Sequence, residues 1–422
     1  MIFKKESIFT SLFSFYILLG SALLLFTSCT KNEAVGDLQI TEPVGISRDL
    51  EYVEVNITID PRRLVNKALF LRNRNDGDLI IGQILDRSKI LLDSNVVQCL
   101  FPISIKAHET NEYEIVIGDN KKTITDLELK GERLDLFIEN EYFKADLTSK
   151  KTSDNKELSA GQLSSISLKQ HNDINLERNN IKMHWAPSFQ KKNVDYKTMA
   201  HIQEFDSIHI EKGPYVISVY RSGKVNDYEE IQLEGEYKFY AGKPYFSFSS
   251  EMKMVDSLTV TMLRNDEMTM NRFFTHAIFP IANGKIKTIP LYDKAPLISH
   301  HSIKELRKHP VDANARWFAF YNDSTKYGFG SLRLHFDYKN LSGGLSPMID
   351  AQTKITYAHH EGRYWDRRFV DSGELRVPKG SKYFEENVYA IFDVDNEHPS
   401  KEIEKLYEQL SNPVIMKYTP IQ

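Results

Sequence analysis

Hydrophobic and polar residues alternate at every second position along most of this chain, and this alternation constrains the fold more than any other feature. Residues 51–59 show it first, and residues 214–220, 235–240, 244–248 and 257–263 repeat it. Successive side chains of a β-strand face opposite sides of a sheet, so the pattern predicts strands with one buried face. The short segment 241–244 between two such runs predicts a hairpin loop. The sequence therefore predicts a mainly β fold with few helices. One large antiparallel β-sandwich and a small sandwich joined to a large one both fit the pattern.

Two segments have helical patterns instead, residues 298–308 and 399–410. In the second, Ser400 is placed as an N-cap, and Ile403, Leu406 and Leu410 fall on one face. We expect this amphipathic helix to pack on the sandwich through that face.

The beginning of the chain has the three parts of an export signal. Lys4 and Lys5 lie in a basic start, residues 8–26 are mostly apolar, and Thr27 and Ser28 precede Cys29. A cysteine after small residues looks like a lipobox, which predicts that residues 1–28 are removed and that Cys29 carries lipid. An uncleaved transmembrane helix is the alternative. Both interpretations place the rest outside the cytoplasm, and the lipidated form predicts an outer-membrane anchor facing the periplasm or the cell surface.

The remaining chain divides by composition into three parts. Residues 29–49 are polar and predict a tether, residues 50–120 predict an N-terminal β region, and residues 121–422 predict the large β-sandwich domain. One continuous domain over residues 50–422 is the alternative.

Charge and cysteine content exclude several classes of function. A net charge of -4 over 422 residues does not suit a nucleic-acid binder. If Cys29 carries lipid, Cys99 has no partner, so we expect no disulfide, no thiolate metal site and a core position for Cys99. The chain also lacks a nucleophile elbow, a P-loop, a dinucleotide fingerprint and an HExxH motif, and we predict neither a metal nor a cofactor.

Four segments combine polar groups with aromatic rings. They are residues 182–189, 263–276, 314–323 and 357–368. In the first, His184 could be a base or a sugar contact, but a lone histidine is more often structural. The second is predicted to follow a strand directly, where strand ends meet loops and binding residues gather. A solvated turn is the alternative. The third is explained mostly by core packing. The fourth contains His359, His360, Tyr364, Trp365 and Arg367, a combination that suits an acidic saccharide because aromatic rings stack on sugars and arginine pairs with carboxylate or sulfate. A metal site at 359–361 is disfavoured, since adjacent strand residues point apart.

The order of these pieces resembles lipoproteins encoded in polysaccharide-utilisation loci. The pieces are the lipobox and residues 138–143, 183–187, 263–269, 274–276 and 364–366. The chain is similar in particular to the family that includes the ulvan oligosaccharide dehydratase, over nearly the whole mature length. This resemblance implies a sandwich of the kind shared by polysaccharide lyases and mutarotase-like domains, and an acidic, uronate-terminated oligosaccharide as substrate. It favours loss of water at a non-reducing uronate, giving a 4,5-unsaturated end.

Such an elimination needs a neutralised carboxylate, a base for the C5 proton and an acid for the departing oxygen. Arginines with Asn265 suit the first task, and histidine or tyrosine suits the others. The residues predicted as catalytic are His184, Arg264, Glu267, His276, His359 and Tyr364, and those predicted to bind substrate are Trp185, Asn265, His360, Trp365 and Arg367.

Three other activities stay open at this point. A polysaccharide lyase would use nearly the same groups, with a sugar as the leaving group. A hydrolase would use two carboxylates among Asp266, Glu267, Glu361 and Asp366, and their separation would decide. A glycan-binding lipoprotein would use the aromatic rings and arginines without a proton-transfer group.

Overall fold

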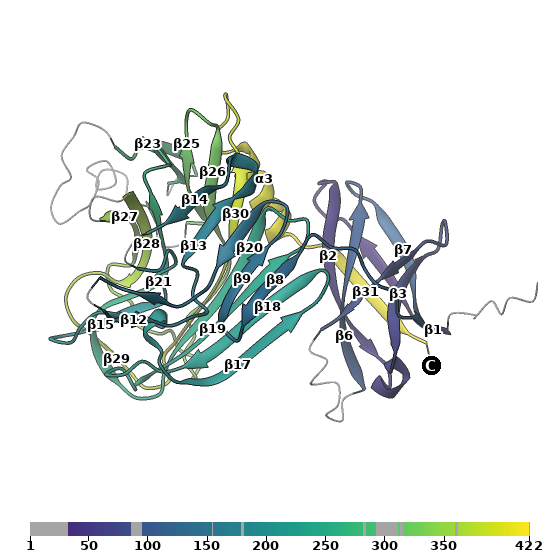
Figure 1. Cartoon of the computed structure of the whole chain (residues 1–422), viewed down its shortest axis with the longest axis horizontal. Helices are drawn as coiled ribbons and strands as arrows, with labels where there is room; N and C mark the ends of the chain where they lie inside the picture. The colour runs from purple at the N-terminus through teal and green to yellow at the C-terminus, as the bar shows by residue number, and fades with distance from the viewer. Residues whose placement is uncertain are drawn as a thin grey trace, which may run out of the picture.

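The mainly β prediction is confirmed by a computed structural model, which describes residues 33–85, 95–153, 155–178, 181–281, 284–292, 311–312, 315–358 and 362–421. These residues form a small and a large β domain that lie side by side (Figure 1). All the strand pairs that form their sheets are antiparallel, and the described residues contain one α-helix, α3 (Lys401–Ser411).

The small domain is a sandwich of two sheets, with strand orders β31-β1-β7-β3-β4 and β2-β6-β5. Its elements are β1 (Glu33–Thr41), β2 (Arg48–Thr58), the 3-10 turn η1 (Pro61–Leu64), β3 (Lys67–Asn73), β4 (Leu79–Ile81), β5 (Gln83–Ile84), β6 (Val96–Ile105), β7 (Thr110–Asp119) and β31 (Ile415–Pro420). Apolar residues of both sheets form one core between them, including Ile40, Ile57 and Ile115. Cys99 is buried there, as predicted.

Two predicted boundaries are wrong in this domain. Residues 29–49 do not form a tether throughout, because β1 pairs with β7 and β31 and buries Val35, Leu38 and Ile40. A register shift between Ala34 and Gly36 interrupts the alternation there, which hides the strand from a period-two pattern. The predicted domain 121–422 also loses its last strand, since β31 returns to the small domain (Figure 1).

The large domain has two layers of sheet around one core. One layer is the nine-stranded sheet β17-β18-β19-β20-β30-β26-β25-β22-β23. Its strands are β17 (Phe205–Lys212), β18 (Val216–Gly223), β19 (Ile231–Tyr240), β20 (Tyr245–Met254), β22 (His276–Pro280), β23 (Ile286–Pro290), β25 (Trp317–Asn322), β26 (Tyr327–Asp337) and β30 (Lys382–Asp393). The predicted hairpin at 241–244 joins β19 to β20, with Gly242 at φ +59°.

The opposite layer contains a seven-stranded and a five-stranded sheet. The seven-stranded sheet is β16-β15-β21-β28-β27-β24, with β29 also paired to β21, and the five-stranded sheet is β14-β13-β10-β9-β8. The strands of the seven-stranded sheet are β15 (Ser188–Lys191), β16 (Lys197–Thr198), β21 (Leu258–Asn271), β24 (Val311–Asp312), β27 (Gln352–Ala358), β28 (Gly362–Val370) and β29 (Leu375–Val377). The other elements of the large domain are β8 (Glu128–Glu132), β9 (Asp135–Glu139), β10 (Phe143–Asp146), the pair β11 (Lys150–Lys151) and β12 (Glu157–Leu158), β13 (Ser165–Leu168), η3 (Lys169–His171), β14 (Ile174–Glu177) and η4 (Met199–His201).

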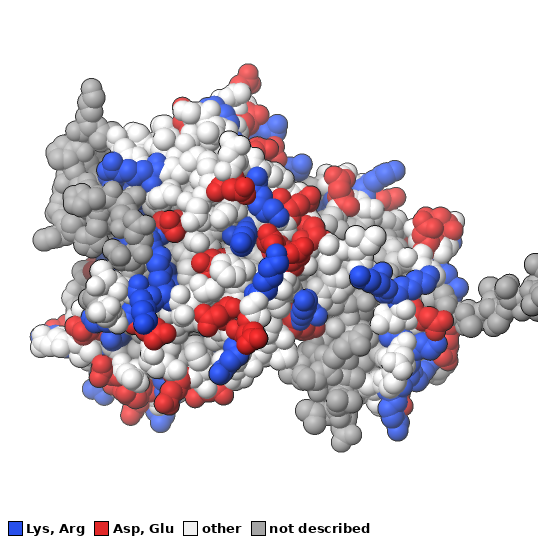
Figure 2. Space-filling view, in the orientation of Figure 1, with Lys and Arg blue, Asp and Glu red and all other residues white. Residues whose placement is uncertain are grey.

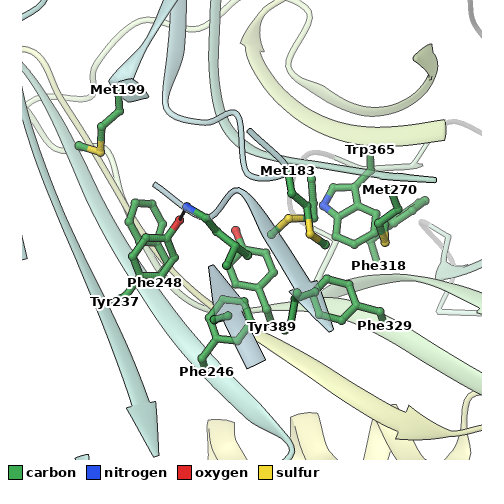
Figure 3. Packing of buried hydrophobic residues seen from close by; sticks show 14 of the residues in the cluster. Met183, Met199, Tyr237, Phe246, Phe248, Met270, Phe318, Phe329, Trp365 and Tyr389 are labelled. Atoms are coloured by element: carbon green, nitrogen blue, oxygen red, sulfur yellow. Dashed lines mark hydrogen bonds between the residues drawn. The ribbon is translucent and has the colours of Figure 1, made fainter. Parts of the chain in front are cut away.

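Aromatic rings fill the space between the two layers (Figure 3). Tyr237 lies 4.4 Å from Phe248 between ring centroids, and the ring of Trp365 from β28 lies 5.0 Å from that of Phe320 on β25. Each fully buried apolar side chain of this size contributes roughly 1.5–3 kcal/mol. This packing holds β21 and β28 in a fixed position over the nine-stranded sheet.

Helix α3 covers the other face of the nine-stranded sheet. Ile403 is buried, and Leu406 and Leu410 are partly buried against residues of β25, β26 and β30, as the amphipathic pattern predicted. The other predicted helix, residues 298–308, lies outside the described residues, as do the signal segment and Cys29. No helix in the described part of the chain is both long and apolar enough to cross a membrane.

Acidic and basic groups are interspersed on the face seen in Figure 2.

Candidate active site on the outer face of the seven-stranded sheet

Strand β21 carries the segment 263–270 in its middle, so the prediction that these polar groups follow a strand is wrong. The ladder between β21 and β28 shifts register on both sides of Arg264, and Asn265 has no partner in it. Such an irregularity re-aims side chains. Asn265 and Asp266 both face the interior, where they contact β20 and β26, whereas Arg264 and Glu267 face outward.

The inward side chains belong to a buried polar network that joins the two layers. Asp266 accepts hydrogen bonds from Ser331, Trp365 Nε1 and the Tyr389 hydroxyl at 2.7, 3.2 and 3.0 Å. His184 lies between the hydroxyls of Tyr237 and Tyr389, at 2.6 and 3.3 Å. The labelled rings Trp365, Tyr237 and Tyr389 lie within this core in Figure 3.

Four predicted site residues are therefore structural. His184 is fully buried, and burial, followed by the nearby Arg221, lowers its pKa to about 3, so it stays neutral and has no access to substrate. Trp365 and Arg367 are also buried, and Arg367 pairs with Glu385. Asn265 is only 1% exposed. The catalytic role predicted for His184 and the substrate contacts predicted for Asn265, Trp365 and Arg367 are wrong. The register irregularity turns Asn265 inward, and alternation along β28 turns Trp365 and Arg367 inward. His184 lies in the core between two tyrosine hydroxyls.

The outward side chains form a second cluster, which we call the outer-face cluster: Ser188, Tyr196, Arg264, Glu267, Tyr364, Asp366 and Arg368. Arg264 donates to Glu267 at 3.0 Å and pairs with Asp366 at 3.0 Å. Arg368 donates to Asp366 at 2.7 Å. The Tyr196 hydroxyl donates to Glu267 at 3.3 Å. Two carboxylates and two guanidinium groups thus share one outward surface.

Burial raises the pKa of two acidic groups in this cluster, Glu267 and Tyr364. Burial raises the pKa of Glu267, and the opposing influence of Arg264 does not cancel it. Burial, together with Asp366 and Glu267, raises the pKa of Tyr364 to about 12, so this phenol stays protonated near neutral pH. Arg264 and Arg368 remain 11% and 15% exposed, whereas Glu267 is 2% exposed. The guanidinium groups therefore border the solvent, with the carboxylates beneath them.

Aromatic rings flank the cluster. The backbone N–H of Trp185 donates to the Glu267 carbonyl at 3.0 Å, which fixes Trp185 beside β21. The Trp185 and Tyr196 rings stack with centroids 6.2 Å apart and an interplanar angle of 27°. His201 meets Trp185 edge-on at 5.5 Å, and burial lowers the pKa of His201 to about 4. Trp185 is only 8% exposed, so Tyr196 is the ring of this group that borders the solvent beside the charged groups.

His276 does not join this cluster. It lies on β22 in the nine-stranded sheet, and its ring stacks on Tyr321 at 5.3 Å. Its neighbours Ala277 and Phe279 face the core, so His276 faces the opposite side of the sheet, the side of Ile278 and Tyr321. The prediction that His276 serves the same site as Arg264 is wrong. His359 and His360, with Glu361, lie outside the described residues.

Sequence reasoning found Arg264, Glu267, Tyr364 and Trp185, and the structure brings them together. It missed Tyr196 and Ser188, which reach Glu267 across more than seventy positions of the chain. The sequence could have predicted Arg368. Residues 364, 366 and 368 of a regular strand face the same side, so Arg368 lies beside Tyr364 and Asp366. Within the described residues, no group of His, Cys, Asp and Glu is arranged to hold a metal ion.

Comparisons with known proteins find similarity only to solved structures, and at very low sequence identity. No family model matches the chain, and no curated protein matches it. Among solved structures, a glycosyl hydrolase family 38 protein from Enterococcus faecalis is 9% identical, with a TM-score of 0.48 over 96% of this chain and 50% of the other. A galactose mutarotase-like protein from Lactobacillus casei is 11% identical, with a TM-score of 0.35 over 61% of this chain and 99% of the other. The chain spans about half the length of the Enterococcus protein.

Proposed function

We propose that this chain is a lipid-anchored, carbohydrate-active enzyme that eliminates water from the terminal uronate of acidic oligosaccharides at the outer-face cluster. One observation carries the proposal. Glu267, a carboxyl group whose pKa is raised, lies beside a partly exposed guanidinium group, Arg264, and a protonated phenol, Tyr364. A carboxyl group tuned towards neutral pH is suited to proton transfer.

The groups of the cluster match the steps of the reaction. Arg264 and Arg368 neutralise the uronate carboxylate, which makes the C5 proton acidic. Glu267 removes that proton, the C4–C5 double bond forms, and the C4–O bond breaks. The Tyr364 hydroxyl protonates the departing oxygen, which leaves as water. Proton transfer then returns Glu267 and Tyr364 to their starting states.

One aromatic ring supports a saccharide as substrate. Trp185 is only 8% exposed and stacks beneath Tyr196, whose ring is partly exposed beside the cluster. The exposed part of the Tyr196 ring is suited to contact the apolar C–H groups of a sugar.

The lipid anchor on Cys29 belongs to the same proposal. Only residues 30–32 separate Cys29 from β1, so the small domain would stand next to the membrane. In Figure 1, β1 lies at the end of the molecule away from β21 and β28, which would direct the outer-face cluster away from the lipid. Mass spectrometry of the purified protein tests for diacylglyceryl on Cys29.

The ultraviolet absorbance of a conjugated enoate tests the elimination directly. Mature protein without residues 1–29 is incubated with uronate-terminated oligosaccharides, and the products are weighed by mass spectrometry. We expect rising absorbance with loss of one water, and a loss of turnover of roughly a hundredfold or more in Glu267→Gln. Glu251→Gln is the control, since Glu251 pairs with Lys382 on the nine-stranded sheet, outside the cluster.

Other outcomes would replace the proposal. Rising absorbance with chain shortening would indicate a lyase. Shortening without absorbance would indicate hydrolysis by Glu267 and Asp366, which Arg264 holds together. Sugar that binds but stays unaltered would indicate a glycan-binding protein.

A further inference from the structure

A cavity lies between the two domains, on the opposite face of the sandwich from the outer-face cluster. It has a volume of about 700 Å³, within the range of small-molecule sites, and such sites favour domain interfaces. The small domain contributes β2 and β6 to its wall, and the large domain contributes β17, β18 and β19. These elements face one another in Figure 1.

Alternation along β19 separates this cavity from the core. Tyr237 and Phe239 point into the buried cluster, so Glu236, Lys238 and Tyr240 point outward and line the cavity. The outer-face cluster lies on the far layer, across the whole aromatic core. The two sites therefore cannot share one sugar ring.

The cavity wall combines aromatic rings with hydrogen-bonding groups. The rings of Tyr52 and Tyr240 stack with centroids 5.9 Å apart and an angle of 25°, and Tyr220 also lines the wall. Glu54, Gln98, Glu236 and Lys238 supply acceptors and donors. Rings that cover apolar C–H faces, together with amide and carboxylate groups that bind hydroxyls, are what a saccharide requires.

The charges in the wall indicate an uncharged ligand. Glu54, Glu211 and Glu236 outnumber Lys238, so an anionic sugar would meet like charges. Two of these carboxylates are already engaged within the protein: Glu54 accepts from Gln98, and Glu236 accepts from Ser218 and lies 3.8 Å from Lys238. Because these partners already satisfy the two carboxylates, neither requires a cationic ligand.

We infer that this interdomain cavity is a binding site for a neutral saccharide segment. It would hold an uncharged stretch of glycan while the outer-face cluster acts elsewhere. The inference goes beyond the proposed function and does not depend on it, since none of the residues that line the cavity belongs to the outer-face cluster.

Isothermal titration with defined neutral hexaoses, namely cellohexaose, xylohexaose and mannohexaose, tests the site on the mature two-domain protein. We expect at least one hexaose to bind, and its affinity to fall roughly tenfold or more in Lys238→Met and in Tyr220→Ala, because a charged hydrogen bond contributes about 1.5–3 kcal/mol. Lys382→Met is the matched control, since Lys382 also forms a cross-strand ion pair on the outer face of the same sheet. Circular dichroism of each variant confirms folding.

The inference is overturned if no hexaose binds, or if Lys238→Met and Tyr220→Ala bind as well as the unchanged protein. Titration of Glu267→Gln separates it from the proposed function. Hexaose binding that persists in this variant, whether or not the unchanged protein gives an absorbance signal, supports the cavity site by itself.

Discussion

At the scale of single residues, the position of Glu267 decides its chemistry. Its neighbour Asp266 is equally buried, but three donors and Arg367 surround it in the core. Glu267 faces Arg264 and the Tyr196 hydroxyl on the outer side, beneath side chains that remain in contact with solvent. Two consecutive acidic residues thus have different surroundings, and only the outward one lies beside side chains that border the solvent.

The raised pKa of Glu267 gives a prediction for the pH dependence of turnover. A base must be ionised, so kcat/KM should fall as the pH decreases through the pKa of Glu267. Burial raises that pKa, so the fall should begin above the pKa of about 4.3 of a free glutamate. A pH profile of kcat/KM measures it. A profile that stays flat down to the pKa of a free glutamate would remove Glu267 from the role of base.

Tyr364 gives a second prediction at this scale. Its pKa of about 12 keeps the proton available for the leaving oxygen, so Tyr364→Phe should lower kcat by roughly tenfold to a hundredfold or more and change KM little. Tyr338→Phe is the control, because Tyr338 packs on Phe336 in the nine-stranded layer. An unchanged kcat in Tyr364→Phe would assign the acid to another group.

At the scale of elements, strand β21 shows what sequence patterns can and cannot predict. Alternation correctly predicted β2, β18, β19 and β20, the β19–β20 hairpin and α3, because each of these depends on a local period. The sequence analysis assigned Asn265 and Arg367 to the site, because alternation does not reveal which face of a strand is buried. In addition, the irregular ladder at Arg264 interrupts the alternation next to Asn265. Tyr196 and Ser188 depend on pairing between distant strands, and no local pattern reveals such contacts.

The buried network beneath β21 should contribute to stability rather than to chemistry. Tyr389→Phe removes the hydroxyl that donates to Asp266 at 3.0 Å and leaves that carboxylate with one donor fewer. We expect a loss of roughly 1–3 kcal/mol in the free energy of unfolding, measured by urea denaturation with tryptophan fluorescence, since Trp185, Trp317 and Trp365 all lie in the large domain. Tyr220→Phe should cost less, because its hydroxyl bonds Glu234 in a partly exposed position. Equal losses in both variants would mean that the network adds no stability.

At the scale of the whole molecule, the chain passes between the domains twice, through residues 120–127 and again through residues 412–414. Arg48 ties the second passage to the small domain. Its guanidinium donates to the Gln409 and Asn412 carbonyls at 3.2 and 2.6 Å, at the end of α3, and pairs with Glu42 at 3.2 Å. The small domain, the last helix and the returning strand β31 are therefore joined at one buried ion pair.

This ion pair predicts an acid limit to the stability of the small domain. Burial raises the pKa of Glu42, but hydrogen bonds from the backbone N–H groups of His108, Val44 and Gly45, and from Arg48, outweigh it and lower the pKa to about 2. A carboxyl group with a lowered pKa in the folded state stabilises the fold above its unfolded pKa, near 4.5, and this contribution is lost as the pH falls towards about 2. Glu42→Gln should therefore weaken the small domain at neutral pH by roughly 3 kcal/mol and flatten this acid dependence.

All three tryptophans lie in the large domain, so hydrogen exchange of β1 and β2 amides is the appropriate measurement. Glu33→Gln, which breaks an exposed pair with Arg63, should change stability by less than about 1 kcal/mol. The β1 and β2 amides of Glu42→Gln could instead exchange as slowly as those of the unchanged protein at neutral pH. The Arg48–Glu42 ion pair would then not stabilise the small domain, and strand pairing and apolar contacts would hold it together.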